Sequence, residues 1–362
     1  MTCLEIDLKK LEHNYFSLRN RLQPQTKMIG VVKANAYGSL SVPVAQKLVD
    51  LGLESLAVAY APEGNKLRQS GIEIPIMVFY PQTENFDEII RNNLEPVLYS
   101  KRSWEGFVKA VRVSKKMNYP VHIKYNTGLN RIGFGPDEVD WILENVVKGP
   151  IEVKTIYSHL GQTESQKPDR FTDNQISTFE AIIEKHNTAA THKPEYHLLN
   201  TSGVFNYPDY HMDWVRVGLG LYGLANHPQW NHNLFPIAEL KTNITQIHKI
   251  MKGETVGYNC GWSAPENTRI AVLPLGHADG LSRQHGHGKG AVMVHGKKAP
   301  IVGNVCMDMV MIDIGDIHCK EGDEVVIFGN GFRVDDLAEN AGTISYELLA
   351  ALSDRIPRVI KN

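Results

Sequence analysis

The sequence predicts an α/β protein: an N-terminal (β/α)8 barrel followed by a smaller β-rich domain. Two observations predict the barrel. Short apolar runs alternate with longer amphipathic runs, and eight such units fit into roughly 220 residues, the size of a (β/α)8 barrel. A third observation predicts the second domain, because strand-like runs separated by Gly-rich turns crowd together after residue 236. A doubly wound open sheet is the alternative that the alternating pattern leaves open.

The eight strand candidates are near-continuous apolar runs, as expected for strands buried on both faces of a parallel sheet. They cover residues 28–34, 55–60, 74–79, 94–100, 121–126, 151–160, 195–203 and 214–223. Amphipathic helical patterns occupy residues 10–22, 42–52, 101–117, 136–149 and 173–187. We therefore assign residues 9–235 to the barrel.

The second domain is predicted over residues 236–362. Its strand-like runs cover residues 241–250, 269–276, 290–297, 309–315 and 323–329, and a helical stretch follows at 346–354. The first strand-like run of the chain, 3–8, precedes the first barrel helix and has no place among the eight barrel strands. We expect residues 1–8 to pair with the second domain.

Charge and composition argue against several classes of protein. Lys and Arg number 38 and Asp and Glu number 40, so the net charge of −2 lacks the basic excess of a nucleic-acid-binding protein. No apolar run approaches the roughly 20 residues of a membrane span. The four cysteines form no metal-ligand spacing, and we expect them to be reduced. The first residues lack the pattern of a signal peptide, so we expect a cytoplasmic protein with no membrane or nucleic-acid partner.

Functional side chains of a (β/α)8 barrel lie at the C-terminal ends of its strands. Polar and cationic residues collect there in this sequence: Lys33, Arg131, Ser158, His159, Thr201, Ser202, Arg216 and Gly218. Lys33 ends a strongly apolar run, where burial would lower its pKa and favour the free amine that Schiff-base chemistry needs. The alternative is a lysine that extends into solvent from the strand end. The Thr201 hydroxyl and the backbone N–H groups near Gly218 suit a phosphate.

Ordered motifs along the chain carry a resemblance to one family. They are VVKANAYG, NTGLNRIGF, SHL, HLLNTSGVFNYPD, VRVGLGLYGL, VGYNCGWSA, PLGHADGL, APIVGNVCMDMVMIDIG and YELLAALSDRIPRV. In this order and spacing the sequence resembles alanine racemases. The VCMD segment together with VGY is the most specific signal, because other pyridoxal-phosphate barrels share a lysine segment similar to VKANAYG.

The resemblance implies pyridoxal 5′-phosphate as cofactor and a head-to-tail homodimer with shared active sites. It implies that Lys33 is linked to the cofactor as a Schiff base and is the base on the D-face. Tyr258 matches the base on the opposite face, supplied by the other subunit. Two flanking groups suit racemisation, which removes the Cα proton on one face and returns a proton on the other. The implied activity is interconversion of L- and D-alanine, which supplies D-alanine for peptidoglycan.

The resemblance also implies how charge is arranged around the cofactor. His159 and Arg216 match residues of a hydrogen-bonded chain to the catalytic tyrosine. Arg216 also matches the residue that contacts the pyridine nitrogen of the cofactor. An arginine at this position keeps that nitrogen unprotonated. Arg131 matches the residue that reaches the cofactor's phenolic oxygen and the substrate carboxylate. Lys124 matches a lysine that is carbamylated in some relatives, and a plain structural lysine is the alternative.

The remaining matched residues contact the cofactor phosphate and the amino-acid substrate. The phosphate-binding set is Tyr37, Thr201, Gly218, Leu219 and Tyr346. Met307 matches a residue of the partner subunit whose backbone contacts the substrate carboxylate. No metal site is implied: the segment with His285, His287 and His295 is expected to be a solvated loop.

The sequence departs from the family's usual residues at two positions, and three alternative functions remain open. His277 stands where the family usually has a tyrosine at the substrate entrance, and Thr201 stands where serine is commoner. The smaller, titratable histidine leaves open a serine or broad-specificity racemase. A barrel decarboxylase of basic amino acids is disfavoured by Arg216 and by the tyrosine of VGY. A non-catalytic cofactor carrier is disfavoured by the second domain.

Overall fold

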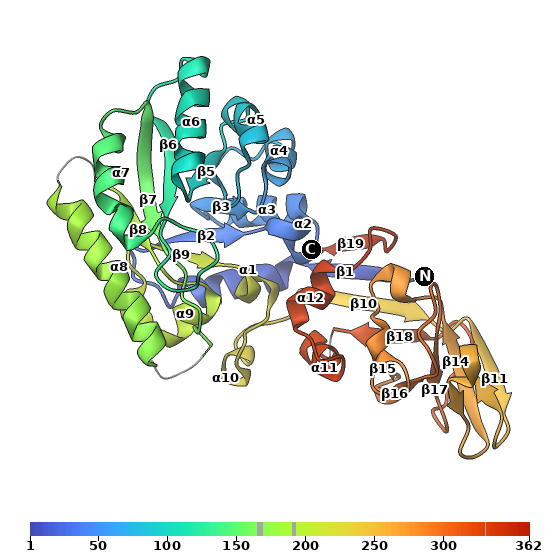
Figure 1. Cartoon of the computed structure of the whole chain (residues 1–362). Helices are drawn as coiled ribbons and strands as arrows, with labels where there is room; N and C mark the ends of the chain where they lie inside the picture. Colours follow the sequence, from blue (N-terminus) through green and yellow to red (C-terminus); the bar gives the residue numbers. More distant parts are fainter. Residues whose placement is uncertain (165–168, 190–192, 330) are drawn as a thin grey trace. The chain divides into compact units, whose positions relative to one another are not determined.

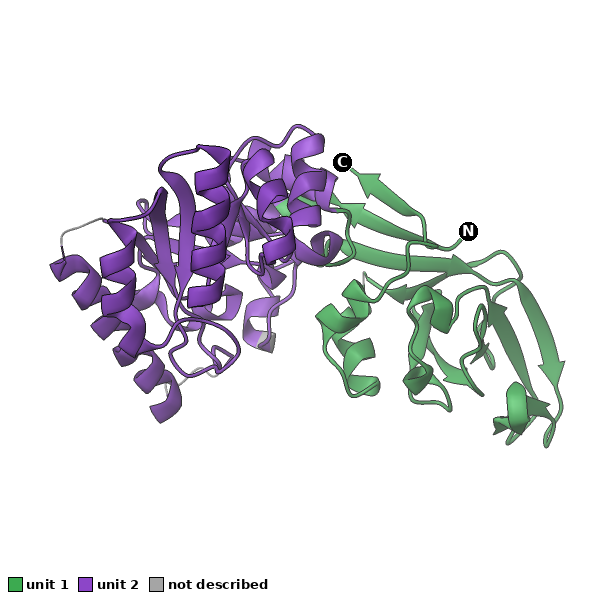
Figure 2. Ribbon diagram, turned by 45° about the horizontal axis from the view of Figure 1, so that its top comes forward, with its two compact units in different colours: residues 1–11, 37–40, 236–362 green, residues 12–36, 41–235 purple. Residues whose placement is uncertain are grey.

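The protein divides into two compact units (Figure 2). The computed structural model describes residues 1–164, 169–189, 193–329 and 331–362. The barrel unit, purple in Figure 2, comprises residues 12–36 and 41–235, and the β-rich unit, green, comprises 1–11, 37–40 and 236–362. This architecture confirms the predicted fold class. Within the described residues, no helix combines the length and apolar character that a membrane span needs.

Eight parallel strands close the barrel (Figure 1). In order around the barrel they are β2 (Lys27–Val31), β3 (Ser55–Val58), β4 (Ile76–Val78), β5 (Glu95–Leu98), β6 (Tyr119–Lys124), β7 (Ile151–Tyr157), β8 (Glu195–His197) and β9 (Trp214–Val217). The last strand pairs with the first, with Lys27 opposite Trp214. Because the sheet is closed, the open doubly wound alternative is wrong.

Every predicted barrel strand is present, but each ends earlier than its apolar run suggested. The run 195–203 ends as a strand at His197, and the run 214–223 ends at Val217. Beyond these points the chain stays buried while it turns onto the rim of the barrel. Apolar character therefore marks burial here, and it does not by itself mark the end of a strand.

The helices of the barrel unit pack outside the strands (Figure 1). The longer ones are α1 (Leu8–Arg19), α3 (Ser41–Asp50), α4 (Ala61–Gln69), α6 (Lys101–Ser114), α7 (Val139–Val146) and α8 (Arg170–Thr188). Shorter helical segments are α2 (Lys33–Tyr37), α5 (Phe86–Arg91), α9 (Thr201–Asn206), α10 (Pro228–Asn231), η1 (Thr83–Asn85), η2 (Pro136–Glu138), η3 (Pro208–Tyr210) and η4 (Leu219–Tyr222). The sequence pattern did not predict α4, which contains Gly64. A Cβ there would lie 2.9 Å from the Leu94 side chain, so glycine permits close packing at the expense of helix propensity.

The β-rich unit is built on a nine-stranded sheet in the order β11-β14-β17-β16-β15-β18-β10-β1-β19. Its strands are β1 (Cys3–Asp7), β10 (Ala238–Asn243), β11 (Gln246–Ile250), β14 (Thr268–Leu273), β15 (Ala291–Val294), β16 (Lys297–Val302), β17 (Val310–Asp313), β18 (Glu324–Phe328) and β19 (Arg358–Lys361). The N-terminal strand β1 pairs with β10 and with β19. The sequence analysis did not predict β16 and β19, because β16 contains Pro300 and the short β19 begins and ends with a charged residue.

Smaller elements complete the β-rich unit. They are the hairpin of β12 (Thr255–Val256) and β13 (Trp262–Ser263), the turns η5 (Tyr258–Cys260), η6 (His277–Asp279) and η7 (Arg283–His285), and the helices α11 (Val334–Asn340) and α12 (Ser345–Ala350).

The prediction of a solvated loop is wrong for His285, because this residue is fully buried. The backbone N–H of Gly290 donates to the His285 carbonyl, so the chain closes over this residue before entering β15. Neither ring nitrogen of His285 finds a partner within the described residues, and burial lowers its pKa. His287 and His295 are exposed. The described residues contain no group of side chains that could hold a metal ion.

Gly133 fixes a rim loop onto β6. The Asn126 N–H donates to the Phe134 carbonyl and the Phe134 N–H donates to the Lys124 carbonyl, both at 2.9 Å. Residues 126–133, which include Arg131, therefore return to the strand that they left. Gly133 has φ of 135°, and a Cβ there would lie 2.6 Å from the Asn126 nitrogen. Only glycine fits this backbone without strain.

Gly133→Ala is expected to destabilise the barrel unit by about 2 kcal/mol or more, because strain in the backbone adds to a clash with it. Thermal unfolding of the two purified proteins measures the loss. Gly71→Ala is the matched control, since Gly71 has φ of 89° but open space around its Cβ position. We expect the control to lose only about 1 kcal/mol. Equal losses in the two variants would contradict the role of the close approach.

Candidate functional site

Four cationic side chains gather at the C-terminal rim of the barrel unit. Lys33 follows β2, Lys124 ends β6, Arg131 lies on the loop after β6, and Arg216 lies within β9. Burial and then the charges of Arg131, Arg216 and Lys33 lower the pKa of Lys124 to about 7. Burial and the charge of Arg131 also lower the pKa of Lys33, against the opposing charge of Glu63. The structure thus brings together predicted site residues that are far apart in the sequence, in surroundings that favour neutral amines and bind anions.

The chain makes a left-handed turn directly after Lys33. Residues 34–37 all have φ between 51° and 56°, although none is glycine. Each such residue costs about 1 kcal/mol, so the turn must be held from outside. Glu63 of α4 holds it, because its carboxylate accepts the N–H groups of Ala34 at 2.6 Å and Ala59 at 2.7 Å. Strain concentrated at this point of the barrel supports a functional role for Lys33.

Arg216 is almost fully buried and its hydrogen bonds fix it in the barrel. NH1 lies 2.6 Å from His197 Nδ1, and NH2 donates to the carbonyls of Ser158 and Leu198, both at 2.9 Å. NH2 also lies 3.2 Å from His159 Nδ1. Burial lowers the pKa of Arg216 to about 10, which leaves it charged at neutral pH. Since an arginine only donates, both histidines must present a lone pair at Nδ1.

The two histidines beside Arg216 are therefore neutral. Burial, followed by the charge of Arg216, lowers the pKa of His159 and of His197 well below the usual range. Tyr157 supports this group: its ring stacks on His197 with 4.6 Å between centroids, and Arg216 lies 4.9 Å above it. Sequence reasoning found His159 and Arg216 but missed His197 and Tyr157, because both lie inside strand-like runs that indicated only a core role.

A second group of rim residues surrounds Thr201. The Thr201 hydroxyl accepts the N–H groups of Gly218 at 3.1 Å and Gly220 at 3.3 Å. A Cβ at Gly220 would lie 2.7 Å from the Thr201 side chain, so the turn fits against α9 only with glycine. Leu219 begins η4, and the first N–H groups of a helix have no partner within it. Thr201, Gly218 and Leu219 thus lie together, as a phosphate site would require.

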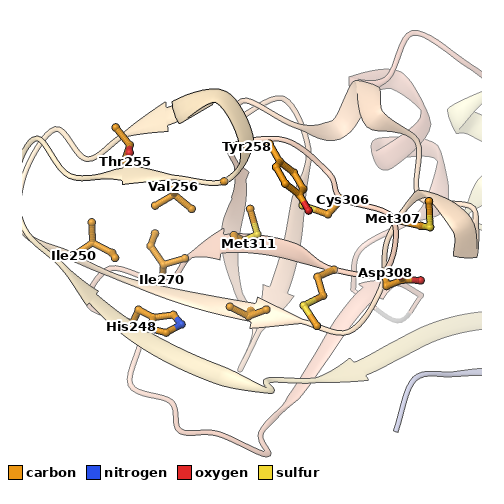
Figure 3. A pocket seen from close by; sticks show the side chains of 13 residues that line it. His248, Ile250, Thr255, Val256, Tyr258, Ile270, Cys306, Met307, Asp308 and Met311 are labelled. Carbon is orange, nitrogen blue, oxygen red and sulfur yellow. The ribbon is translucent and has the colours of Figure 1, made fainter.

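In the β-rich unit, Tyr258 and Met307 line one groove of about 570 Å³ (Figure 3). Tyr258 is 73% exposed and Met307 is 58% exposed, and the exposed Met309 extends the same apolar surface. Exposed apolar surface of this kind marks an interaction site.

The Met307 segment is clamped by the loop that carries His277. The His277 N–H donates to the Cys306 carbonyl at 2.9 Å, and the Ala278 N–H donates to the Met307 carbonyl at 3.0 Å. A Cβ at Gly276 would lie 2.2 Å from that same Met307 oxygen, so only glycine permits this approach. His277 itself is exposed.

Tyr37 and Tyr346 also belong to the β-rich unit. Burial, and to a lesser extent the nearby Tyr346, raises the pKa of Tyr37. The Tyr37 side chain is therefore a neutral donor at neutral pH. Their contacts with a phosphate stay predictions, as do the other roles that the sequence resemblance implied.

Comparisons with known proteins agree over almost the whole chain. The family described as Alanine racemase, N-terminal domain, matches residues 6–226, and Alanine racemase, C-terminal domain, matches residues 237–360. Alanine racemase 1 of Clostridium acetobutylicum is 38% identical over 370 residues, which cover 99% of this chain and 95% of the relative. An alanine racemase of Clostridium perfringens is 36% identical over 369 residues, covering 99% and 94%.

A solved structure agrees as well. The alanine racemase of Clostridium difficile 630 superposes with a TM-score of 0.93 at 31% sequence identity, covering 99% of this chain and 95% of that chain. Both domains, their order and the barrel geometry correspond. The chain belongs to the alanine racemase family.

Proposed function

We propose that this protein interconverts L- and D-alanine with pyridoxal 5′-phosphate, using Lys33 and Tyr258 as bases on opposite faces of the substrate. The observation that carries the proposal is the cationic barrel rim, where burial and the charge of Arg131 lower the pKa of the half-buried Lys33. The names of the relatives support alanine as substrate. D-alanine supply for peptidoglycan is the corresponding proposed role.

The residues present fit the cofactor. Arg216 keeps a donor, Nε–H, that contacts no acceptor within the described residues, and this donor suits an unprotonated pyridine nitrogen. The glycine-lined turn at Thr201 and Gly218 suits the phosphate. When bound, the cofactor supplies an electron sink for the charge left when the Cα proton is removed.

The protein's own groups then move the proton and hold the substrate. Lys33 exchanges the Cα proton on one face and Tyr258 on the other. A phenol with an ordinary pKa near 10 is a poor base at neutral pH, so cationic surroundings are needed to stabilise its phenolate. The barrel rim of a second subunit offers such surroundings, and the exposed groove around Tyr258 and Met307 offers a surface for it. We therefore propose a homodimer with shared active sites.

Substrate selection is assigned to three residues. The planar guanidinium of Arg131 would bind the amino-acid carboxylate, assisted by the backbone at Met307 of the partner subunit. His277 would line the entrance, and its exposure favours a second candidate function, racemisation of serine or a broader range of amino acids. Chiral chromatography of products from a panel of L-amino acids distinguishes the two functions.

The cofactor is expected to attach covalently to Lys33. Borohydride reduction followed by peptide mapping should place the label on Lys33, and Lys33→Ala should lose the label and more than about 100-fold of racemase activity. Lys109→Ala, an exposed lysine on α6, is the control that keeps both. A label on Lys124, whose pKa is lowered to about 7, would overturn the assignment.

Tyr258→Phe is expected to keep the cofactor but to lower kcat by at least about 100-fold, because one proton-transfer group is lost. Absorption spectra measure the bound cofactor and chiral chromatography measures turnover. Tyr210→Phe, at the half-buried Tyr210 of η3, is the control. Unchanged turnover in Tyr258→Phe would sink the two-base assignment.

Mixing two inactive variants tests whether the site is shared. When Lys33→Ala and Tyr258→Phe subunits exchange at random, about half of the dimers are heterodimers. Each heterodimer has one intact site of two, so about one quarter of wild-type activity should return. No recovery despite proven subunit exchange would place both residues of a site in one chain.

Lys124 is proposed to be carbamylated. Its pKa of about 7 lies below the ordinary 10.5, so the neutral amine prevails as the pH rises above 7 and can add to CO2 with release of a proton. At fixed dissolved CO2, the carbamate resonance of isotope-labelled samples should increase as the pH is raised through 7. It should vanish in Lys124→Met and persist in the exposed control Lys154→Met. A resonance that survives in Lys124→Met would refute the proposal.

A further inference from the structure

A chain of hydrogen bonds crosses the barrel interior from the rim to the start of β5. Arg216 NH1 lies 2.6 Å from His197 Nδ1, and His197 Nε2 lies 2.8 Å from Thr155 Oγ1. Thr155 Oγ1 lies 2.8 Å from His122 Nδ1, and His122 Nε2 lies 3.0 Å from Glu95 Oε2. The strands β9, β8, β7, β6 and β5 each contribute one member. All members except Glu95 are buried, with at most 4% of their surface exposed.

Arginine chemistry sets the direction at one end of this chain, and the carboxylate sets it at the other. Arg216 only donates, so His197 Nδ1 accepts and its proton lies on Nε2. His197 Nε2–H then donates to the Thr155 oxygen, and the Thr155 hydroxyl donates to His122 Nδ1 in the arrangement that gives each donor one acceptor. His122 in turn carries its proton on Nε2 and donates to Glu95. Each donor finds one acceptor, and the chain ends on a group that only accepts.

The chain joins a buried cation to a carboxylate. Burial opposes ionisation of Glu95, but its pKa is lowered, because the hydrogen bond from His122 and the charges of Lys154 and Arg68 favour the carboxylate. An ionised Glu95 polarises the two imidazoles in the same sense, so that His197 Nδ1 becomes a stronger acceptor. Stacking on Tyr157 fixes the plane of the His197 ring, and the hydrogen bond to Thr155 fixes its rotation within that plane.

We propose that Glu95, His122 and Thr155 are positioning residues that hold Arg216 through His197 and thereby set how its guanidinium meets the cofactor. This inference rests on the proposed function, because it concerns the contact of Arg216 with the pyridine nitrogen. In the hydrogen-bond chain, the three residues are linked to Arg216 through His197. A structural role alone would affect stability; a positioning role also changes the cofactor spectrum and kcat.

The tautomers are tested without any measurement of turnover. Nitrogen NMR of isotope-labelled histidine rings in the cofactor-loaded protein at neutral pH should show both His122 and His197 neutral and protonated on Nε2. A doubly protonated His122, or a His197 protonated on Nδ1, would overturn the direction of the chain. This measurement stands even if the protein does not racemise alanine.

The positioning role is tested with Thr155→Val, which keeps the shape but removes the hydroxyl. We expect kcat to fall about tenfold with little change in KM, because the contact of Arg216 acts on charge that develops in the transition state. The absorption band of the bound cofactor should shift. Thr155→Ser should restore both, and Glu95→Gln, which keeps an acceptor but removes the charge, should show the same spectral shift to a smaller extent.

Thr26→Val is the matched control. Thr26 is also buried in the barrel unit, and its hydroxyl donates at 2.9 Å to the Met212 carbonyl. Neither residue belongs to the hydrogen-bond chain that joins Arg216 to Glu95. Both valine variants should lower the melting temperature, but only Thr155→Val should change kcat and the spectrum. Changes of equal size in the two variants would overturn the proposal. A wild-type protein without racemase activity would instead refute the proposed function, and the spectral comparison would still test the positioning of Arg216.

Discussion

The burial of one guanidinium, that of Arg216, is the constraint on which the rest of the site depends. A charge with 4% exposure inside a barrel is costly unless fixed acceptors surround it. The carbonyls of Ser158 and Leu198 and the Nδ1 atoms of His159 and His197 provide these acceptors. Because the arginine cannot accept a hydrogen bond, its position decides the protonation of both histidines.

The same cation shapes the chemistry of its neighbours. Arg216 and Arg131 both disfavour the ammonium form of Lys124, and Arg131 disfavours that of Lys33. Both amines gain nucleophilic character, although the charge of Glu63 opposes this at Lys33. The left-handed turn after Lys33 adds a geometric constraint, since Glu63 holds it in a backbone conformation that its sequence would not choose.

Much of the fold could be predicted because burial on both faces leaves a continuous apolar signal in each barrel strand. The signal failed where packing overrides local preference. Gly64 weakens the helical pattern of α4 so that the helix can approach Leu94, and Pro300 hides β16 although it pairs on both sides. His285 is polar and lies among glycines, yet the chain folds over it and buries it completely. Hydropathy does not reveal such enclosure, because it comes from the path of the backbone.

By itself, the sequence determined the fold class, the family resemblance and the residue types at the barrel rim, because all three are properties of residues close together along the chain. Only the tertiary structure decided which of these side chains meet. Glu95, His122, Thr155 and His197 come from four strands, and nothing in any one strand shows that its polar residue faces the barrel interior. Strand register places them in contact, and the buried arginine and the carboxylate then order their protons, since a hydrogen-bond chain takes its direction from end groups that can only donate or only accept.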